Sequence, residues 1–130
     1  MRPVALLLTA AALQACQKDE TVRAYGGGDR LWVLTEIDDT PFPARATLRF
    51  PEPGLIAGEA PCNSYRAEMT VPYPWFEAGP IIATRRGCAD LAAETRFLEA
   101  LGRASLSEVA GDVLLLTDPD GLVMVFRADG

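Results

Sequence analysis

The sequence contains no histidine, and its only lysine is Lys18. Histidine is the usual general base near neutral pH and the commonest metal ligand in proteins. Its absence excludes Ser-His and Cys-His nucleophiles and the HExxH type of metal site, and no CxxC pair is present either. We therefore expect a protein that is not an enzyme and that carries no cofactor and no metal. Catalysis by carboxylates alone stays open, although no pair of acidic residues points to it.

Positive charge is scarce as well. The 130-residue chain has 12 basic and 18 acidic residues, which gives a net charge of -6 at pH 7. A nucleic-acid-binding protein needs a basic surface to neutralise phosphates, so this balance excludes nucleic acid as a partner. The same balance disfavours electrostatic adhesion to anionic lipid.

The chain also lacks an apolar run long enough to cross a membrane. The run at residues 4–12 falls well short of the roughly 20 residues that span a bilayer. Arg2 precedes it and Ala15-Cys16 follows it, an order that predicts a secretory signal peptide at residues 1–15.

Residues 13–16, Leu-Gln-Ala-Cys, resemble the lipobox of bacterial lipoproteins. The resemblance implies that a diacylglyceryl group is attached to the Cys16 thiol and that the signal is cut off in front of this residue. By the enterobacterial sorting rule, Gln17 in place of aspartate implies the outer membrane, with the protein on its periplasmic face. The lipid on Cys16 would then make the contact with the membrane, because several acyl chains attach a protein stably. A plain secretory signal with a chance cysteine is the alternative.

Residues 17–28 are polar and end in three glycines. This composition predicts that residues 16–29 form a lipidated cysteine followed by a flexible tether. The domain proper then spans residues 30–130, which is room for one small core.

Beyond the tether, short runs of β-forming residues alternate with turn signals, which predicts strands. In residues 89–103, by contrast, Ala93, Phe97 and Leu101 recur at helical spacing. We expect an α+β fold in which a mostly antiparallel curved sheet, a partly open barrel, is covered by one amphipathic helix. The charged helix residues expected to face away from the core are Glu94, Arg96, Glu99 and Arg103. The expected strands are residues 31–37, 46–50, 55–59, 64–71, 75–76, 81–84, 113–117 and 122–127.

Four motifs in order along this domain resemble the META/HslJ family. They are a WxL strand, a GxxxCNxY strand, a TxxxC segment and an ExxFLxxL helix, and with them the resemblance covers residues 30–130. It implies a small, mostly β, envelope-associated domain without an agreed biochemical activity. The motif residues, which are expected to have structural roles, are Trp32, Gly58, Asn63, Tyr65, Thr84, Arg85 and Glu94.

These features together predict a non-catalytic envelope lipoprotein with a binding or structural role in the periplasm. Its partner would be an unknown envelope protein or a hydrophobic ligand. The alternative is a carrier of an acyl chain or another small hydrophobic ligand, because some family members have been compared with pilot lipoproteins that bind acyl chains. That comparison concerns the fold, and small barrels are usually filled by their own side chains.

Cys62 and Cys88 form an even pair beyond Cys16, in a compartment where thiols oxidise. We expect a structural disulfide between them. Two buried free thiols are the second interpretation. A redox-active pair is the third, because no histidine is present to stabilise a thiolate.

Four smaller features concern binding and turns. Arg85 and Arg86, as neighbours on a strand, are expected to point to opposite faces and to pair with nearby acids rather than clamp an anion. Asn63 is expected to satisfy backbone groups in a bend. The aromatic segment, residues 72–76, predicts a proline-bounded edge strand, with an exposed binding rim as the alternative. Residues 118–121, Asp-Pro-Asp-Gly, predict a hairpin turn.

Overall fold

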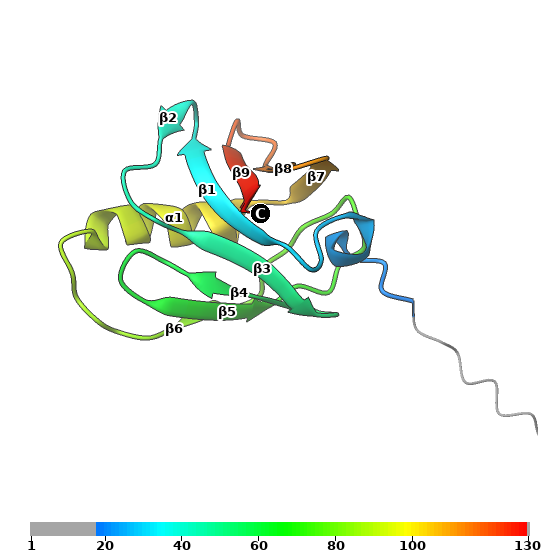
Figure 1. Cartoon of the computed structure of the whole chain (residues 1–130), viewed down its shortest axis with the longest axis horizontal. Helices are drawn as coiled ribbons and strands as arrows, with labels where there is room; N and C mark the ends of the chain where they lie inside the picture. Colours follow the sequence, from blue (N-terminus) through cyan, green and yellow to red (C-terminus); the bar gives the residue numbers. More distant parts are fainter. Residues whose placement is uncertain (1–17, 130) are drawn as a thin grey trace, which may run out of the picture.

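The computed structural model describes residues 18–129, and Figure 1 shows how they are arranged. Nine strands form one sheet in the order β6-β5-β4-β3-β1-β9-β8-β7, with β2 paired only to β1, and all neighbours are antiparallel. The strands are β1 (Leu31–Ile37), β2 (Thr40–Pro41), β3 (Thr47–Glu52), β4 (Leu55–Glu59), β5 (Ser64–Glu68), β6 (Ile82–Ala83), β7 (Leu106–Ala110), β8 (Val113–Thr117) and β9 (Val123–Asp129). The predicted signal peptide and the lipidation of Cys16 lie outside the described residues.

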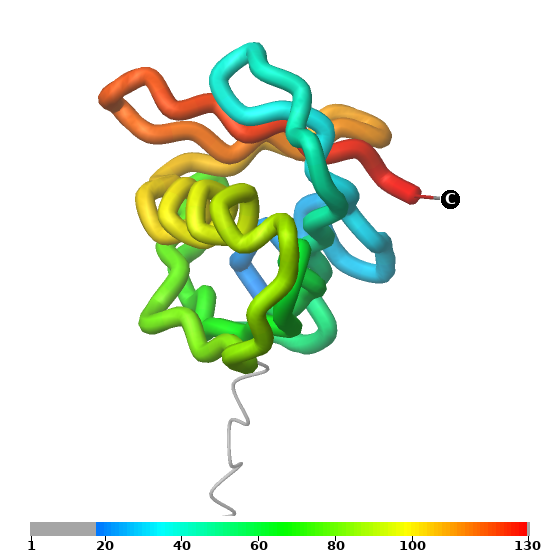
Figure 2. Tube along the Cα trace, turned by 90° about the vertical axis from the view of Figure 1, so that its left-hand side faces the viewer, coloured from blue at the N-terminus to red at the C-terminus, as the bar shows by residue number. Residues whose placement is uncertain are grey.

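One helix, α1 (Leu91–Arg103), covers the inner face of the curved sheet. Figure 2 looks along this helix and shows it between the β8–β9 hairpin above and β4 and β5 below. The predicted α+β fold, a mostly antiparallel curved sheet with one helix, is therefore confirmed. Within residues 18–129, no helix has the length and apolarity that crossing a membrane requires.

The core fills the space between the sheet and α1. Alternate residues of the strands point inward, as a sheet with one buried face requires. The large side chains that are almost wholly buried include Trp32, Leu48, Ile56, Phe76, Phe97, Leu101, Leu114, Leu116, Met124 and Phe126. Burying a side chain of this size contributes roughly 1.5 to 3 kcal/mol, so this set is the main source of the fold's stability.

The two ends of the sheet differ. At β7 the aromatic segment runs along the outer edge: Trp75 forms a β-bridge with Leu106, and the Ser107 N–H donates to the Pro74 oxygen at 2.7 Å. Phe76 is buried, whereas Trp75 is 57% exposed. The predicted edge strand is thus present as a single bridge that covers the edge of β7. At the other end, β6 pairs only with β5.

The flexible tether predicted for residues 16–29 is wrong for its described part. A 3-10 helix, η1 (Val22–Tyr25), packs against the domain with Val22 fully buried in the core. The Trp32 indole N–H donates to the Gly27 oxygen at 2.9 Å, which fixes the glycine run. Gly26 has a φ of 106°, so this glycine closes the turn after η1 in a backbone conformation that suits glycine. This segment therefore forms a tight turn and contributes one apolar side chain, Val22, to the core.

Element boundaries differ from the sequence-based expectation in several places. The predicted strand at residues 64–71 ends at Glu68, and the helix begins at Leu91 rather than at residue 89. Strand β7 was not predicted, because Leu-Ser-Glu-Val-Ala is a weak strand pattern on its own. Pairing with all five residues of β8 stabilises this strand in place of a strong local strand preference. The hairpin at residues 118–121 is confirmed by the β8–β9 pairing.

Candidate functional site

The candidate site lies where the start of α1 meets the segment between β6 and the helix. Glu94 is only 5% exposed and projects from the first turns of α1 towards the turn before β5. One carboxylate oxygen accepts the Cys62 N–H at 3.0 Å and the Asn63 N–H at 2.8 Å. The other accepts the Asn63 side-chain amide at 2.6 Å. Three donors thus compensate the burial of this carboxylate.

The expectation that Glu94 faces away from the core is wrong. Glu94, Phe97 and Leu101 occupy one buried stripe of α1, whereas Ala93 is only partly buried. Charge usually marks the solvent face of a helix, but here the unpaired N–H groups of the turn before β5 draw the carboxylate inward. Arg96, Glu99 and Arg103 are exposed as expected.

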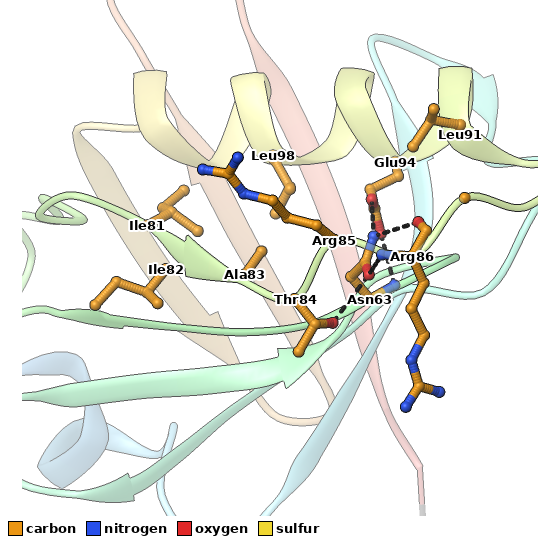
Figure 3. A pocket seen from close by; sticks show the side chains of 11 residues that line it. Asn63, Ile81, Ile82, Ala83, Thr84, Arg85, Arg86, Leu91, Glu94 and Leu98 are labelled. Atoms are coloured by element: carbon orange, nitrogen blue, oxygen red, sulfur yellow. Dashed lines mark hydrogen bonds between the residues drawn. The ribbon is translucent and has the colours of Figure 1, made fainter.

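Asn63 links the other segments of the site. Its side-chain oxygen accepts the Arg86 N–H at 2.5 Å and the Thr84 hydroxyl at 2.9 Å, and its amide donates to the Arg86 oxygen at 3.0 Å. The dashed lines of Figure 3 show this network with Glu94 above it. The prediction that Asn63 satisfies backbone groups in a bend is confirmed. The network holds residues 84–86 at a fixed distance from α1.

A disulfide also joins the turn before β5 to the segment between β6 and α1. Cys62 and Cys88 are bonded, with their Cα atoms 5.6 Å apart and a sequence separation of 26. The predicted disulfide is therefore present, and the interpretation as two buried thiols is wrong, because Cys88 lies on the exposed segment before α1. A pair of this kind fixes the position of the segment before α1 relative to β5.

Three further motif residues support the sheet behind the site. The Tyr65 hydroxyl donates to the Thr47 oxygen at 2.6 Å, and burial raises the pKa of the Tyr65 phenol far above its ordinary value. Gly58 leaves room for this contact, because a Cβ there would overlap the Thr47 carbonyl. Trp32 is fully buried, and Arg30 lies 5.2 Å from the centre of its ring. These residues shape the fold and take no direct part in the groove.

An open groove of about 620 Å³ runs between α1 and residues 81–87. Ile81, Leu91 and Leu98 give it apolar walls. Figure 3 shows Arg85 reaching towards α1 and Arg86 pointing the opposite way. The two side chains diverge as predicted, but β6 ends at Ala83 and neither arginine lies on a strand.

The expected ion pairs of these arginines are not formed. In the part of the chain that the structure describes, no carboxylate lies within 4.0 Å of Arg85 or Arg86. The nearest buried acid, Glu94, is bonded to the turn before β5 instead. Both guanidinium groups are therefore available to an anionic ligand.

The chemistry open to this site is recognition of anionic and apolar groups. Both oxygens of Glu94 and the whole amide of Asn63 are already hydrogen-bonded, so neither group is placed to exchange a proton with a ligand. Among residues 18–129, no three His, Cys, Asp or Glu side chains gather as metal ligands would. Sequence reasoning found the residues of the network, but it missed the buried position of Glu94 and the groove.

Comparison with known proteins identifies the domain. The META domain family matches residues 28–130. The chain belongs to the META domain family. The suspected family is thus confirmed. The match begins at residue 28, the last glycine of the run before β1.

The fold of this META domain also occurs in solved structures. An NMR structure of a protein from Burkholderia xenovorans has a TM-score of 0.66 and 19% identity, covering 83% of this chain and 87% of that one. A crystal structure of a DUF4847 family protein from Bacteroides vulgatus has a TM-score of 0.59 and 14% identity, covering 82% and 95%. At these identities the likeness concerns the fold alone. A search of curated proteins gives no match.

Proposed function

We propose that this META-domain protein is an envelope lipoprotein with a non-catalytic binding or structural role. The observation that carries the proposal is the sequence Leu-Gln-Ala-Cys at residues 13–16 behind a short apolar run. Lipid on Cys16 anchors the protein, and Gln17 favours the outer membrane with the domain on the periplasmic side.

The position of η1 determines how far the domain can lie from this anchor. The fold begins almost at once: Asp19 accepts the Thr21 N–H at 2.9 Å, and the Tyr73 N–H donates to the Glu20 oxygen at 2.7 Å. From Cys16 to Asp19 the chain can span at most about 11 Å. A lipid on Cys16 therefore holds the domain close to the membrane surface, with no long tether between them.

The state of the site supports binding over catalysis. The only buried carboxylate of the groove, Glu94, accepts three hydrogen bonds within the protein, and the chain has no histidine to act as a base. What the groove offers to a ligand is the Arg85 guanidinium and apolar walls, and the Arg86 guanidinium lies outside it. Such a surface recognises charge and shape without transferring a proton.

The carrier alternative receives no support from the interior of the sheet. An acyl chain would need the space that Trp32, Phe97 and Phe126 occupy, and all three are fully buried. A small barrel filled by its own side chains has no room for such a ligand.

Metabolic labelling with a fatty-acid analogue, followed by membrane fractionation, tests the anchor. The wild type is expected to be labelled and membrane-bound, and Cys16→Ser is expected to lose both properties. The matched control is the Cys62→Ser, Cys88→Ser double variant, which keeps Cys16 and should stay labelled. A Cys16→Ser protein that remains labelled and bound would refute the lipoprotein assignment.

A further inference from the structure

Strand β6 presents an unpaired backbone edge to the groove. In the ladder with β5, Tyr65 lies opposite Ala83, and next to them the Thr84 N–H donates to the Ser64 oxygen at 3.1 Å. Bonded and non-bonded pairs alternate in an antiparallel ladder, so Tyr65 and Ala83 form a non-bonded pair. The N–H and C=O of Ala83 therefore point away from β5. Within residues 18–129 no loop or strand beyond β5 supplies a backbone partner for them.

The opposite edge of the sheet, at β7, is covered by the aromatic segment. There the aromatic segment bonds to β7 and its neighbours, with the Phe76 N–H donating to the Ser105 oxygen at 2.9 Å. Proteins usually cover, shorten or charge a free edge, because an open one pairs with other chains. β6 is short and has arginines near it, but no segment covers it, and its first residue, Ile82, is 61% exposed.

Unpaired arginines surround this edge. Of the ten arginines in residues 18–129, four form ion pairs there and six do not. Arg49 and Arg66 lie in the same cross-strand row as Ile82, through Ala57, on the exposed face of the sheet. The β6 patch is defined here as Ile82, Ala83 and the four unpaired arginines near them, Arg49, Arg66, Arg85 and Arg86.

The charge of the β6 patch is opposite to that of the whole chain, which is -6. Glu59 on β4 and Glu68 on β5 belong to the same part of the sheet, but neither comes within 4.0 Å of these arginines in the described structure. Charge complementarity thus favours an acidic partner, and the free backbone groups of Ala83 favour one with an extended backbone. A lipid headgroup would satisfy the charge but would leave the regular edge unused.

The position of the β6 patch also favours a protein partner. In Figure 1 the first described residues, in blue, lie at the right-hand end, while β6 and the segment leading to α1 lie towards the left. An anchor on Cys16 would hold the right-hand end at the membrane. β6 would then lie at the end of the domain away from the lipid surface.

We propose that an extended acidic segment of a partner protein adds as a strand to β6. Its backbone pairs with Ala83, its carboxylates meet the arginines of the β6 patch, and its apolar side chains contact Ile82 or the groove under α1. Alternate side chains of an added strand point to opposite faces, so both contacts can form at once. The inference rests on the binding role proposed above and names the class of partner.

Two measurements, amide hydrogen exchange and peptide affinity, test this inference. Both use the full protein purified from cells in dodecyl maltoside. The probe is a synthetic peptide of alternating glutamate and valine, with a lysine–valine peptide as its counterpart. Binding of the acidic peptide should slow hydrogen exchange at the Ala83 amide. Arg85→Glu with Arg86→Glu should weaken its affinity by about tenfold, since several exposed ion pairs are lost and reversed.

Matched variants separate strand addition from general attraction. Arg96→Glu with Arg127→Glu changes the net charge equally but uses the two unpaired arginines outside the β6 patch, and it should bind almost like the wild type. Ala83→Pro removes the outward N–H without removing a bond to β5, and it should abolish binding. Ala83→Gly, which keeps the N–H, should bind. If Ala83→Pro does not fold, exchange at Ala83 in the wild type decides.

Three results would overturn the inference. Equal weakening in both double variants would mean attraction without a site, and binding without slower exchange at Ala83 would mean no strand addition. The third is slower exchange at the β6 patch in phosphatidylglycerol nanodiscs but not with the peptide, which would assign the patch to the membrane. None of these results depends on Cys16, so a failed anchor and a failed β6 patch are distinguishable.

Discussion

At the scale of single residues, Gly58 shows how closely the backbone segments approach behind the groove. A Cβ at this position would overlap the Thr47 carbonyl oxygen and stand 2.8 Å from the Tyr65 hydroxyl. That hydroxyl donates to the same Thr47 oxygen at 2.6 Å, so neither neighbour can move without loss of a buried hydrogen bond. The glycine of the GxxxCNxY motif is thus required by the packing of β3 on β4 and β5.

We predict that Gly58→Ala lowers the free energy of unfolding by about 3 kcal/mol, because overpacking against backbone cannot be relieved by a rotamer change. Gly102→Ala is the matched control: nothing lies within 4 Å of its added Cβ, and alanine favours the helix by about 0.5 kcal/mol or more. Urea unfolding of both variants measures the difference. Equal stabilities of the two would contradict the close approach at Gly58.

The positions of the polar residues of the site were predicted only in part. Asn63 was identified from its motif and its role in a bend was predicted, because Asn side chains commonly hydrogen-bond backbone groups in turns. Glu94 was placed on the wrong face, because helical periodicity treats every charge as solvent-facing. Its partners are the N–H groups of Cys62 and Asn63, 32 and 31 residues away in sequence, so no local pattern could reveal them.

At the scale of elements, one side chain holds the turn of the β8–β9 hairpin. Asp118 accepts the Leu122 N–H at 2.8 Å and the Asp120 N–H at 3.0 Å, and Arg103 at the end of α1 donates to it at 3.1 Å. The Leu122 N–H, aided by the other two donors, holds the pKa of the Asp118 carboxyl below its ordinary value. The turn therefore also fixes the hairpin to the helix.

This lowered pKa predicts a pH-dependent contribution of Asp118 to stability. The stabilisation is present above the unfolded pKa, about 4, and is lost as the pH falls through the lower folded value. Asp118→Asn should therefore destabilise the protein clearly at pH 7 and less at acid pH. Asp120→Asn, whose carboxylate is exposed, is the control and should show neither effect. Denaturant unfolding across this pH range measures both, and a loss in Asp118→Asn independent of pH would contradict the prediction.

Elements with a strong local pattern were predicted, and those formed by pairing were not. β1 and β8 are rich in β-forming residues, and both were expected within the bounds that the structure gives. β7 and η1 have weak patterns and depend on contacts made at a distance: β7 pairs with β8, and Val22 of η1 enters the core. The polar residues around Val22 indicated flexibility because composition cannot show where one apolar side chain is buried.

At the scale of the whole molecule, the sheet has one covered edge and one open edge, and the disulfide lies beside the open one. Cys88 follows the Arg85–Arg86 pair, and its bond to Cys62 ties that segment to the turn before β5. The Asn63 and Glu94 network makes the same connection without a covalent bond. Arg85 and Arg86 of the β6 patch therefore lie on a segment that is fixed twice, which would lower the conformational entropy lost on binding of the partner strand proposed above.

We predict that loss of the disulfide lowers the free energy of unfolding by about 3 kcal/mol, the chain-entropy value for a loop of this length. The sequence separation of 26 sets that value, and the polar network keeps the domain folded after reduction. Denaturant unfolding with and without reductant should show the loss, and oxidised protein should run faster on a non-reducing gel. Cys62→Ser with Cys88→Ser should match the reduced wild type and be insensitive to reductant. A wild type whose stability reductant does not change would show that the polar network alone fixes this end of the molecule.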